Sequence, residues 1–182
     1  MTPLMRRGLV VAALQVTIVA GLGAKLVVER ATLPRTWTRA APVDPNMPIR
    51  GRYVSLRIEA AIGPGLNLPM PGITAMPDGR VVTPSYVLPT PVALAVRNDQ
   101  LVALPTIDRG IPMATMTVRD GQRVAMLSEP LAYFIPEHAL DPSRRPAGEE
   151  LWVEVTVPPS GAPRPIRLGV RKNGVLTPLA FN

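Results

Sequence analysis

The chain has 182 residues, of which 47% are hydrophobic, and a formal net charge of +7. It contains no cysteine, so disulfide bonds and thiolate metal sites are excluded. Residues 1–30 hold four basic residues and Glu29, a net +3, and the remaining +4 is too small and too dispersed to favour nucleic-acid binding.

The apolar residues are concentrated at the start of the chain. Residues 8–24 form an uncharged run of 17 residues, and three further apolar residues follow Lys25. A helix needs ~20 apolar residues to cross a bilayer, with a range of about 17–25. Gly8–Val28 therefore predicts a transmembrane helix, and residues 1–30 are expected to anchor the protein in the bilayer.

The flanking charges predict the orientation of this helix. Arg6 and Arg7 precede it, so the positive-inside rule places the N-terminus in the cytoplasm and the rest beyond the inner (cytoplasmic) membrane, in the periplasm. A single span can tolerate the polar residues Gln15 and Thr17. A cleaved signal peptide is the alternative, because Gly21-Leu22-Gly23 has suitable small residues, but such apolar regions are typically only about 7–15 residues long. A helix buried in a soluble protein is the third interpretation.

Residues 31–50 are rich in proline, which prevents a long helix. We expect an extended connector there, with Thr36–Ala40 as a candidate first strand. Residues 51–182 are then expected to form the extracytoplasmic domain.

The segment from Arg52 to Ala60 alternates between two rows of residues. Period two over this length predicts a half-buried strand. One row begins with Arg52 at the rim and is expected to continue into the core through Val54, Leu56, Ile58 and Ala60. On the opposite face, Arg57 and Glu59 are expected to form a solvated pair.

Residues 63–77 are dense in glycine and proline, which predicts a long loop. Its apolar side chains could form a contact surface for a membrane or a partner. Packing over the end of the domain is the favoured alternative. These side chains are Leu66, Leu68, Met70 and Met76.

Short strand-like segments occupy the rest of the chain. They are 80–87, 92–97, 101–105, 113–119, 123–127, 131–135, 151–157, 166–171 and 175–179. Asn98-Asp99, Asp120-Gly121 and Asn173-Gly174 accept positive φ and suit tight hairpins. Regular short strands with turn signals predict a mainly β protein, with an N-terminal transmembrane helix followed by a small antiparallel β-sandwich or barrel. Residues 137–145 are expected to form a helical turn or two, interrupted by Pro142.

Several stretches resemble a known family. Pro42–Ile58, "PVDPNMPIRGRYVSLRI", resembles the signature region of the GDYXXLXY family of bacterial proteins, which have one N-terminal span and a small extracytoplasmic domain. Glu29–Leu33 and Tyr133–Val170 are similar to that family in position and layout. The resemblance implies no established activity. It implies a multi-span membrane protein as partner, because family members often occur alongside such proteins.

The resemblance also singles out a set of motif residues with a structural or interaction role. They are Asp44, Arg50, Gly51, Arg52, Tyr53 and Leu56. Gly51, Tyr53 and Leu56 keep the family pattern, whereas its aspartate is Arg52 here and its last tyrosine is Ile58. A role that needs a carboxylate at that position is therefore lost. Arg50 and Arg52 are expected to pair with Asp44 or with anionic lipid.

The single histidine provides the enzymatic alternative. His138 lies in a polar turn with Glu137 and Asp141. A Ser-His-Asp arrangement would need Ser85 or Ser128 nearby, and neither lies in a nucleophile-elbow sequence. One imidazole and two carboxylates on a turn are a weak metal signal. We therefore expect a solvated histidine, with no catalytic residue, metal or cofactor assigned.

Together these features predict a membrane-anchored β-domain that is a non-enzymatic binding or accessory subunit for another membrane protein. One alternative is an anchored hydrolase or metal-dependent enzyme that uses His138. Another is a lipid or small-ligand binding module with a cavity between its sheets.

Overall fold

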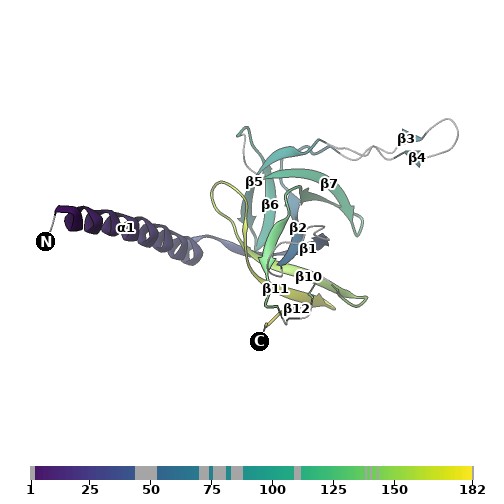
Figure 1. The fold of residues 1–182 in the computed structure, drawn as a ribbon. Helices are drawn as coiled ribbons and strands as arrows, with labels where there is room; N and C mark the ends of the chain where they lie inside the picture. The colour runs from purple at the N-terminus through teal and green to yellow at the C-terminus, as the bar shows by residue number, and fades with distance from the viewer. Residues whose placement is uncertain are drawn as a thin grey trace. The chain divides into compact units, whose positions relative to one another are not determined.

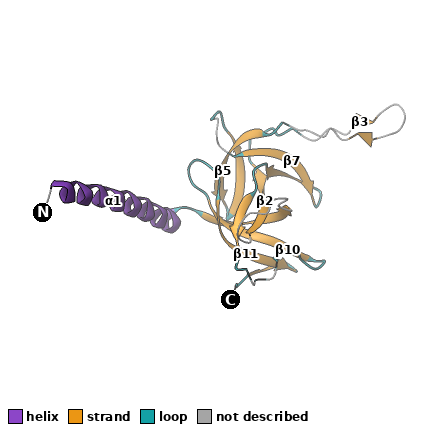
Figure 2. Cartoon of the chain, in the orientation of Figure 1, coloured by secondary structure: helices purple, strands orange, loops and turns teal. Residues whose placement is uncertain are grey.

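The computed structural model describes residues 3–43, 53–69, 74–75, 81–82, 88–108, 112–137, 139, 141–142 and 144–181. Its contacts divide the chain into two compact units, Met1–Leu33 and Pro34–Asn182. The first unit is a single helix and the second is built of strands, as Figures 1 and 2 show. The mainly β fold with one N-terminal apolar helix is confirmed.

The helix α1 spans Pro3–Thr32. Its segment Arg7–Thr32 is long and apolar enough to cross a membrane. These 26 residues measure about 39 Å at 1.5 Å per residue, more than the ~30 Å of a bilayer core. The described side chains of this segment are exposed, apart from the partly buried Glu29. The hydroxyls of Thr17 and Thr32 donate to carbonyls four residues earlier, so both are satisfied within the helix.

The second unit contains the strands. They are β1 (Arg35–Val43), β2 (Tyr53–Ile62), β3 (Thr74–Ala75), β4 (Val81–Val82), β5 (Thr90–Arg97), β6 (Gln100–Pro105), β7 (Met113–Arg119), β8 (Gln122–Leu127), β9 (Leu131–Phe134), β10 (Glu149–Thr156), β11 (Arg164–Lys172) and β12 (Val175–Pro178). Most lie close to the positions predicted from the sequence, but β3 falls within the loop predicted for residues 63–77, and only residues 81–82 of the strand predicted at 80–87 are described as a strand. The strands β3 and β4 form a separate two-stranded pair.

Five strands close into a ring in the order β2, β6, β5, β7, β8 and back to β2. Closure occurs at Ala61, which lies opposite Val102 of β6 on one side and Val124 of β8 on the other. Among the described strand pairs, only β2 and β6 run parallel. A ring of few strands has a narrow interior, which small side chains suit. Its buried residues accordingly include four alanines, Ala60, Ala103, Ala114 and Ala125.

The other strands extend the sheet from the first half of β2. Tyr53–Leu56 pairs with β9, and Ser55–Ile58 pairs with β1 on the opposite side. The first half of β1 pairs with β10, which is followed by β11 and β12. We call β1, β10, β11 and β12 the outer sheet. The extended connector expected at residues 31–50 is therefore wrong for residues 35–43. These residues form the strand β1, which pairs with β10 and with β2.

The strand β2 carries the core, as its alternation predicts. Leu56 and Ile58 are fully buried. The expectation that Arg57 and Glu59 form a solvated pair is wrong, because Arg57 is exposed whereas Glu59 is buried. Strands pair with β2 along both of its edges, and two residues of its polar row, Ser55 and Glu59, are buried.

The local turn signals are confirmed. Asn98, Asp99, Asp120 and Asn173 have positive φ, as do the glycines that follow Asp120 and Asn173. These pairs form the tight turns of the hairpins β5–β6, β7–β8 and β11–β12.

Two other segments can be compared with expectation. In the loop after β2, Leu68 is buried and Leu66 packs against the core, so packing is confirmed for these two residues. Met70 and Met76 lie outside the described residues. The expected helical turn at 137–145 is not seen in the residues described there, which form turns, bends and irregular chain.

The position of Ile58 generates a stability prediction. Ile58→Ala should lower the free energy of unfolding by about 2–5 kcal/mol, because it leaves a cavity in the core beside β2. This strand belongs to the ring and also pairs with β1 of the outer sheet. Urea denaturation of the full-length chain in detergent micelles, followed by tryptophan fluorescence, would measure the change. Val118→Ala is the control, because Val118 is 56% exposed. Equal effects of the two substitutions would contradict this assignment of the core.

Candidate functional site

An open groove of about 680 Å³ lies between the ring and the outer sheet. One wall is formed by residues of β1, β10 and β11, and the other by residues of β2, β6 and the β7–β8 hairpin. Its volume falls within the ~300–1,000 Å³ usual for ligand pockets. Both tryptophans of the chain, Trp37 and Trp152, line it.

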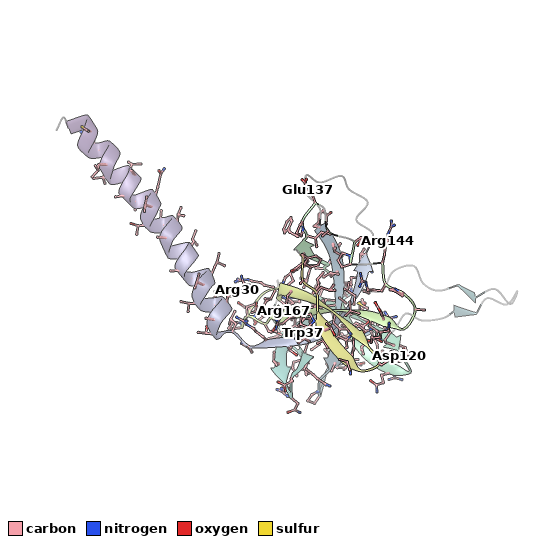
Figure 3. The ribbon with its side chains drawn as sticks, turned by 90° about the horizontal axis from the view of Figure 1, so that it is seen from below. Arg30, Trp37, Asp120, Glu137, Arg144 and Arg167 are labelled. Atoms are coloured by element: carbon pink, nitrogen blue, oxygen red, sulfur yellow. The ribbon has the colours of Figure 1, made fainter. Side chains whose placement is uncertain are left out.

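The register of the outer sheet brings the two tryptophans to one face. Trp37 lies opposite Glu154, and Arg39 lies opposite Trp152. Paired residues point to the same side of a sheet, so these four side chains share a face. The neighbouring strand β11 adds Arg167, which pairs with Glu154. In Figure 3, Trp37 and Arg167 are labelled close together on this face.

Two arginines of β11 stack on these tryptophans. The Arg167 guanidinium lies 5.4 Å from the ring centroid of Trp37, and the Arg171 guanidinium lies 4.9 Å from that of Trp152. Both distances are within the ~6 Å range of cation–π attraction. Arg167 Nε also donates to Glu154 Oε2 at 2.6 Å. The stacking therefore favours the observed orientation of both indole rings.

Gly169 provides the space in which the Trp37 ring lies. A Cβ atom at Gly169 would be 2.8 Å from Cζ3 of Trp37. Real contacts are essentially never this short, so any larger residue would displace the indole ring or the strand. A glycine within a strand often marks such a close approach.

Arg39 bridges the two walls of the groove. Its Nη1 lies 2.7 Å from Oδ2 of Asp120 in the β7–β8 turn, and its Nη2 lies 3.0 Å from Oε1 of Glu150 in β10. Glu150 also accepts a hydrogen bond of 3.1 Å from the indole Nε1 of Trp152. These charge-assisted contacts connect the outer sheet to the ring hairpin.

Glu59 is the most buried carboxylate of the groove. Its side chain is 8% exposed, and its Oε1 accepts a hydrogen bond of 3.0 Å from Nε of Arg119. The Thr38 hydroxyl donates to the backbone carbonyl of the same residue, Glu59. Burial of a carboxylate costs free energy unless the carboxylate is paired. The ion pair with Arg119 therefore offsets part of the cost of burying the Glu59 side chain in β2.

The lining has little net charge. Three arginines and four carboxylates face the groove, and described ion pairs connect Arg39 and Arg119 to acids. The amides of Gln100, Gln122 and Asn173 add hydrogen-bond donors and acceptors. The described lining contains no histidine, cysteine, serine or lysine. This arrangement can bind a polar ligand by hydrogen bonds and by contact with aromatic rings.

The predicted motif residues fall in two groups. Asp44, Arg50, Gly51 and Arg52 lie outside the described residues. Tyr53 begins β2, and its ring centroid is 6.3 Å from that of Phe134 in the paired strand β9. Leu56 is fully buried in the core. Neither of the two described residues lines the groove.

Glu137 and Asp141, the two described residues among the weak catalytic candidates, do not line the groove. His138 lies outside the described residues, and Glu137 is exposed on a turn. Oδ2 of Asp141 lies 3.9 Å from Nε of Arg144, so these two side chains form an ion pair. The described part of the chain has no group of three His, Cys, Asp or Glu residues that could hold a metal ion. The hydroxyl of Ser128 is buried and has no hydrogen-bond partner in that part.

Comparison of the chain with protein-family models, with characterised proteins and with solved structures found no match. The resemblance to the GDYXXLXY family therefore stays a prediction.

Sequence reasoning missed the residues that line the groove. For the outer sheet the sequence did contain a signal. In the segment predicted as a strand, Trp37 and Arg39 alternate with Thr36 and Thr38, which places the tryptophan and the arginine on one face. No comparable signal marked Glu59. Its partner is 60 residues away in the sequence.

The buried acid generates the second prediction. Arg119→Met should lower the free energy of unfolding by about 1–3 kcal/mol, because it leaves the Glu59 carboxylate buried without its cation. Thermal and urea unfolding of the full-length chain would measure the loss. Arg123→Met in the neighbouring strand is the control, because Arg123 is exposed and should change stability by less than about 0.5 kcal/mol. Adding Glu59→Gln to Arg119→Met should recover part of the loss.

Proposed function

We propose that this protein is held in a membrane by α1 and uses its β-domain, outside the cytoplasm, as a non-enzymatic binding module for another membrane protein. One observation carries the proposal: the groove is lined by arginine-paired carboxylates, amides and both tryptophans. Such a lining supports recognition of a polar surface or segment. The partner and the compartment rest on the sequence arguments above.

Preorganisation makes the groove suited to binding. Arg39, Glu150 and Trp152 form a connected set in which each polar group already has a neighbour. A ligand that inserts between fixed groups does not have to order them, which reduces the entropy lost on association. Since Gln100 and Gln122 are exposed at the rim, they are available for new hydrogen bonds.

The ends of α1 support the proposed orientation. Arg6 and Arg7 stand at the N-terminal end of the apolar segment. Near the other end, Lys25 Nζ lies 3.7 Å from Oε1 of Glu29. A lysine close to the end of a span can extend its amine to the headgroup region, and the nearby carboxylate offsets its charge.

Membrane extraction tests the anchor. The full-length chain should stay with the membrane pellet after an alkaline carbonate wash, because α1 has the length and apolarity of a span. Residues 34–182 produced with an exported leader should be released by the same wash. Release of the full-length chain with its first thirty residues intact would refute the anchor.

Obstruction of the groove tests the binding role. The tagged full-length chain is purified in mild detergent, and the membrane protein that accompanies it is quantified. Gln122→Trp should reduce recovery of that protein at least about tenfold, because an indole at the rim fills the groove and leaves the described ion pairs intact.

The matched control is Arg123→Trp. Arg123 is the next residue of the same strand, is exposed and does not line the groove. This variant should recover the partner at the level of the unaltered chain. Equal recovery with Gln122→Trp and Arg123→Trp would show that the groove is not the binding surface.

A further inference from the structure

Gln15 places an amide deep in the apolar segment of α1. It lies seven residues after Gly8, about 10 Å along the helix axis, and thus inside a ~30 Å hydrocarbon core. Its side chain is exposed and has no hydrogen-bond partner in the described part of the chain. Thr17, by contrast, donates to the Ala13 carbonyl. Among the uncharged polar side chains of the segment Arg7–Thr32, the amide of Gln15 is therefore the one without a partner inside the helix, and it is available to a group on a second helix.

The residues around Gln15 form one continuous uncharged face. Positions spaced alternately four and three residues apart form one seam along a helix. With Gln15, this spacing groups Gly8, Ala12, Val19, Leu22 and Leu26. All six residues of this face, Gln15 included, are exposed. Gly8 and Ala12 are small enough to let a second helix approach closely at the N-terminal end.

We infer that α1 pairs in parallel with a second copy of itself through this face, with the two Gln15 amides hydrogen-bonded to each other. A carboxamide has both a donor and an acceptor, so it is its own complement across a two-fold axis. A parallel pair puts both amides at the same depth by symmetry. The inference rests on the proposed membrane span and adds to it the partner of α1.

The absence of cysteine from the chain makes the test direct. Leu22→Cys introduces one thiol on the predicted face, and Ala24→Cys introduces one about 200° further round the helix. Membranes that contain the full-length variants are treated with copper phenanthroline, and disulfide-linked dimer is measured on a non-reducing gel. We expect dimer from Leu22→Cys and at most a trace from Ala24→Cys.

The amide is tested in the Leu22→Cys background. Adding Gln15→Leu should reduce the yield of linked dimer about three- to tenfold, as loss of interhelical hydrogen bonds predicts. Adding Gln15→Asn should keep most of the yield, because the amide is retained.

Three results would overturn the inference. Equal cross-linking at positions 22 and 24 would show that no specific face is involved, and a yield unchanged by Gln15→Leu would exclude the amide pair. If Leu22→Cys does not link while Gln15→Leu abolishes recovery of a different membrane protein, the occupant of the face is a helix of that protein. Release of the chain by carbonate would instead refute the membrane span itself, which separates the two proposals.

Discussion

The β-domain depends on one strand that belongs to both of its halves. The first half of β2 pairs with β1 and β9, and the second half closes the ring with β6 and β8. Because side chains alternate along a strand, a shift of one residue would move Leu56 and Ile58 out of the core and break both sets of pairings at once. The shared strand therefore fixes the ring relative to the outer sheet.

The groove is a consequence of that constraint. Its walls come from different halves, and β2 itself contributes Glu59 to the wall on the ring side. Arg39 then connects Glu150 of the outer sheet to Asp120 of the ring hairpin. Ion pairs at an exposed surface contribute little, but pairs that bridge two elements around a buried carboxylate limit the ways in which those elements can move. The polar groups of the groove are thus connected to one another by contacts within the domain.

The two proposed recognition elements, α1 and the groove, lie on one chain. The groove offers charged, amide and aromatic groups, whereas α1 offers an apolar face with one amide. The contacts proposed for the groove and the pairing proposed for α1 use different residues, so the two proposals are compatible. If both operate, a paired α1 would present two grooves to a partner, and binding at one would raise the effective concentration at the other.

The sequence by itself determined the apolar helix, nearly every strand of the domain and the hairpin turns. These features are local: a run of apolar residues, an alternation of period two and dipeptides such as Asp120-Gly121 act over a few neighbouring positions. Alternation identifies the two faces of a strand but not what covers each face, so Glu59 was expected in solvent. Only the tertiary structure decided that β2 is shared, that β1 is a central strand and that a groove separates the sheets. Those outcomes depend on partners such as Arg39 and Asp120, which are 81 positions apart and meet only when the chain has folded.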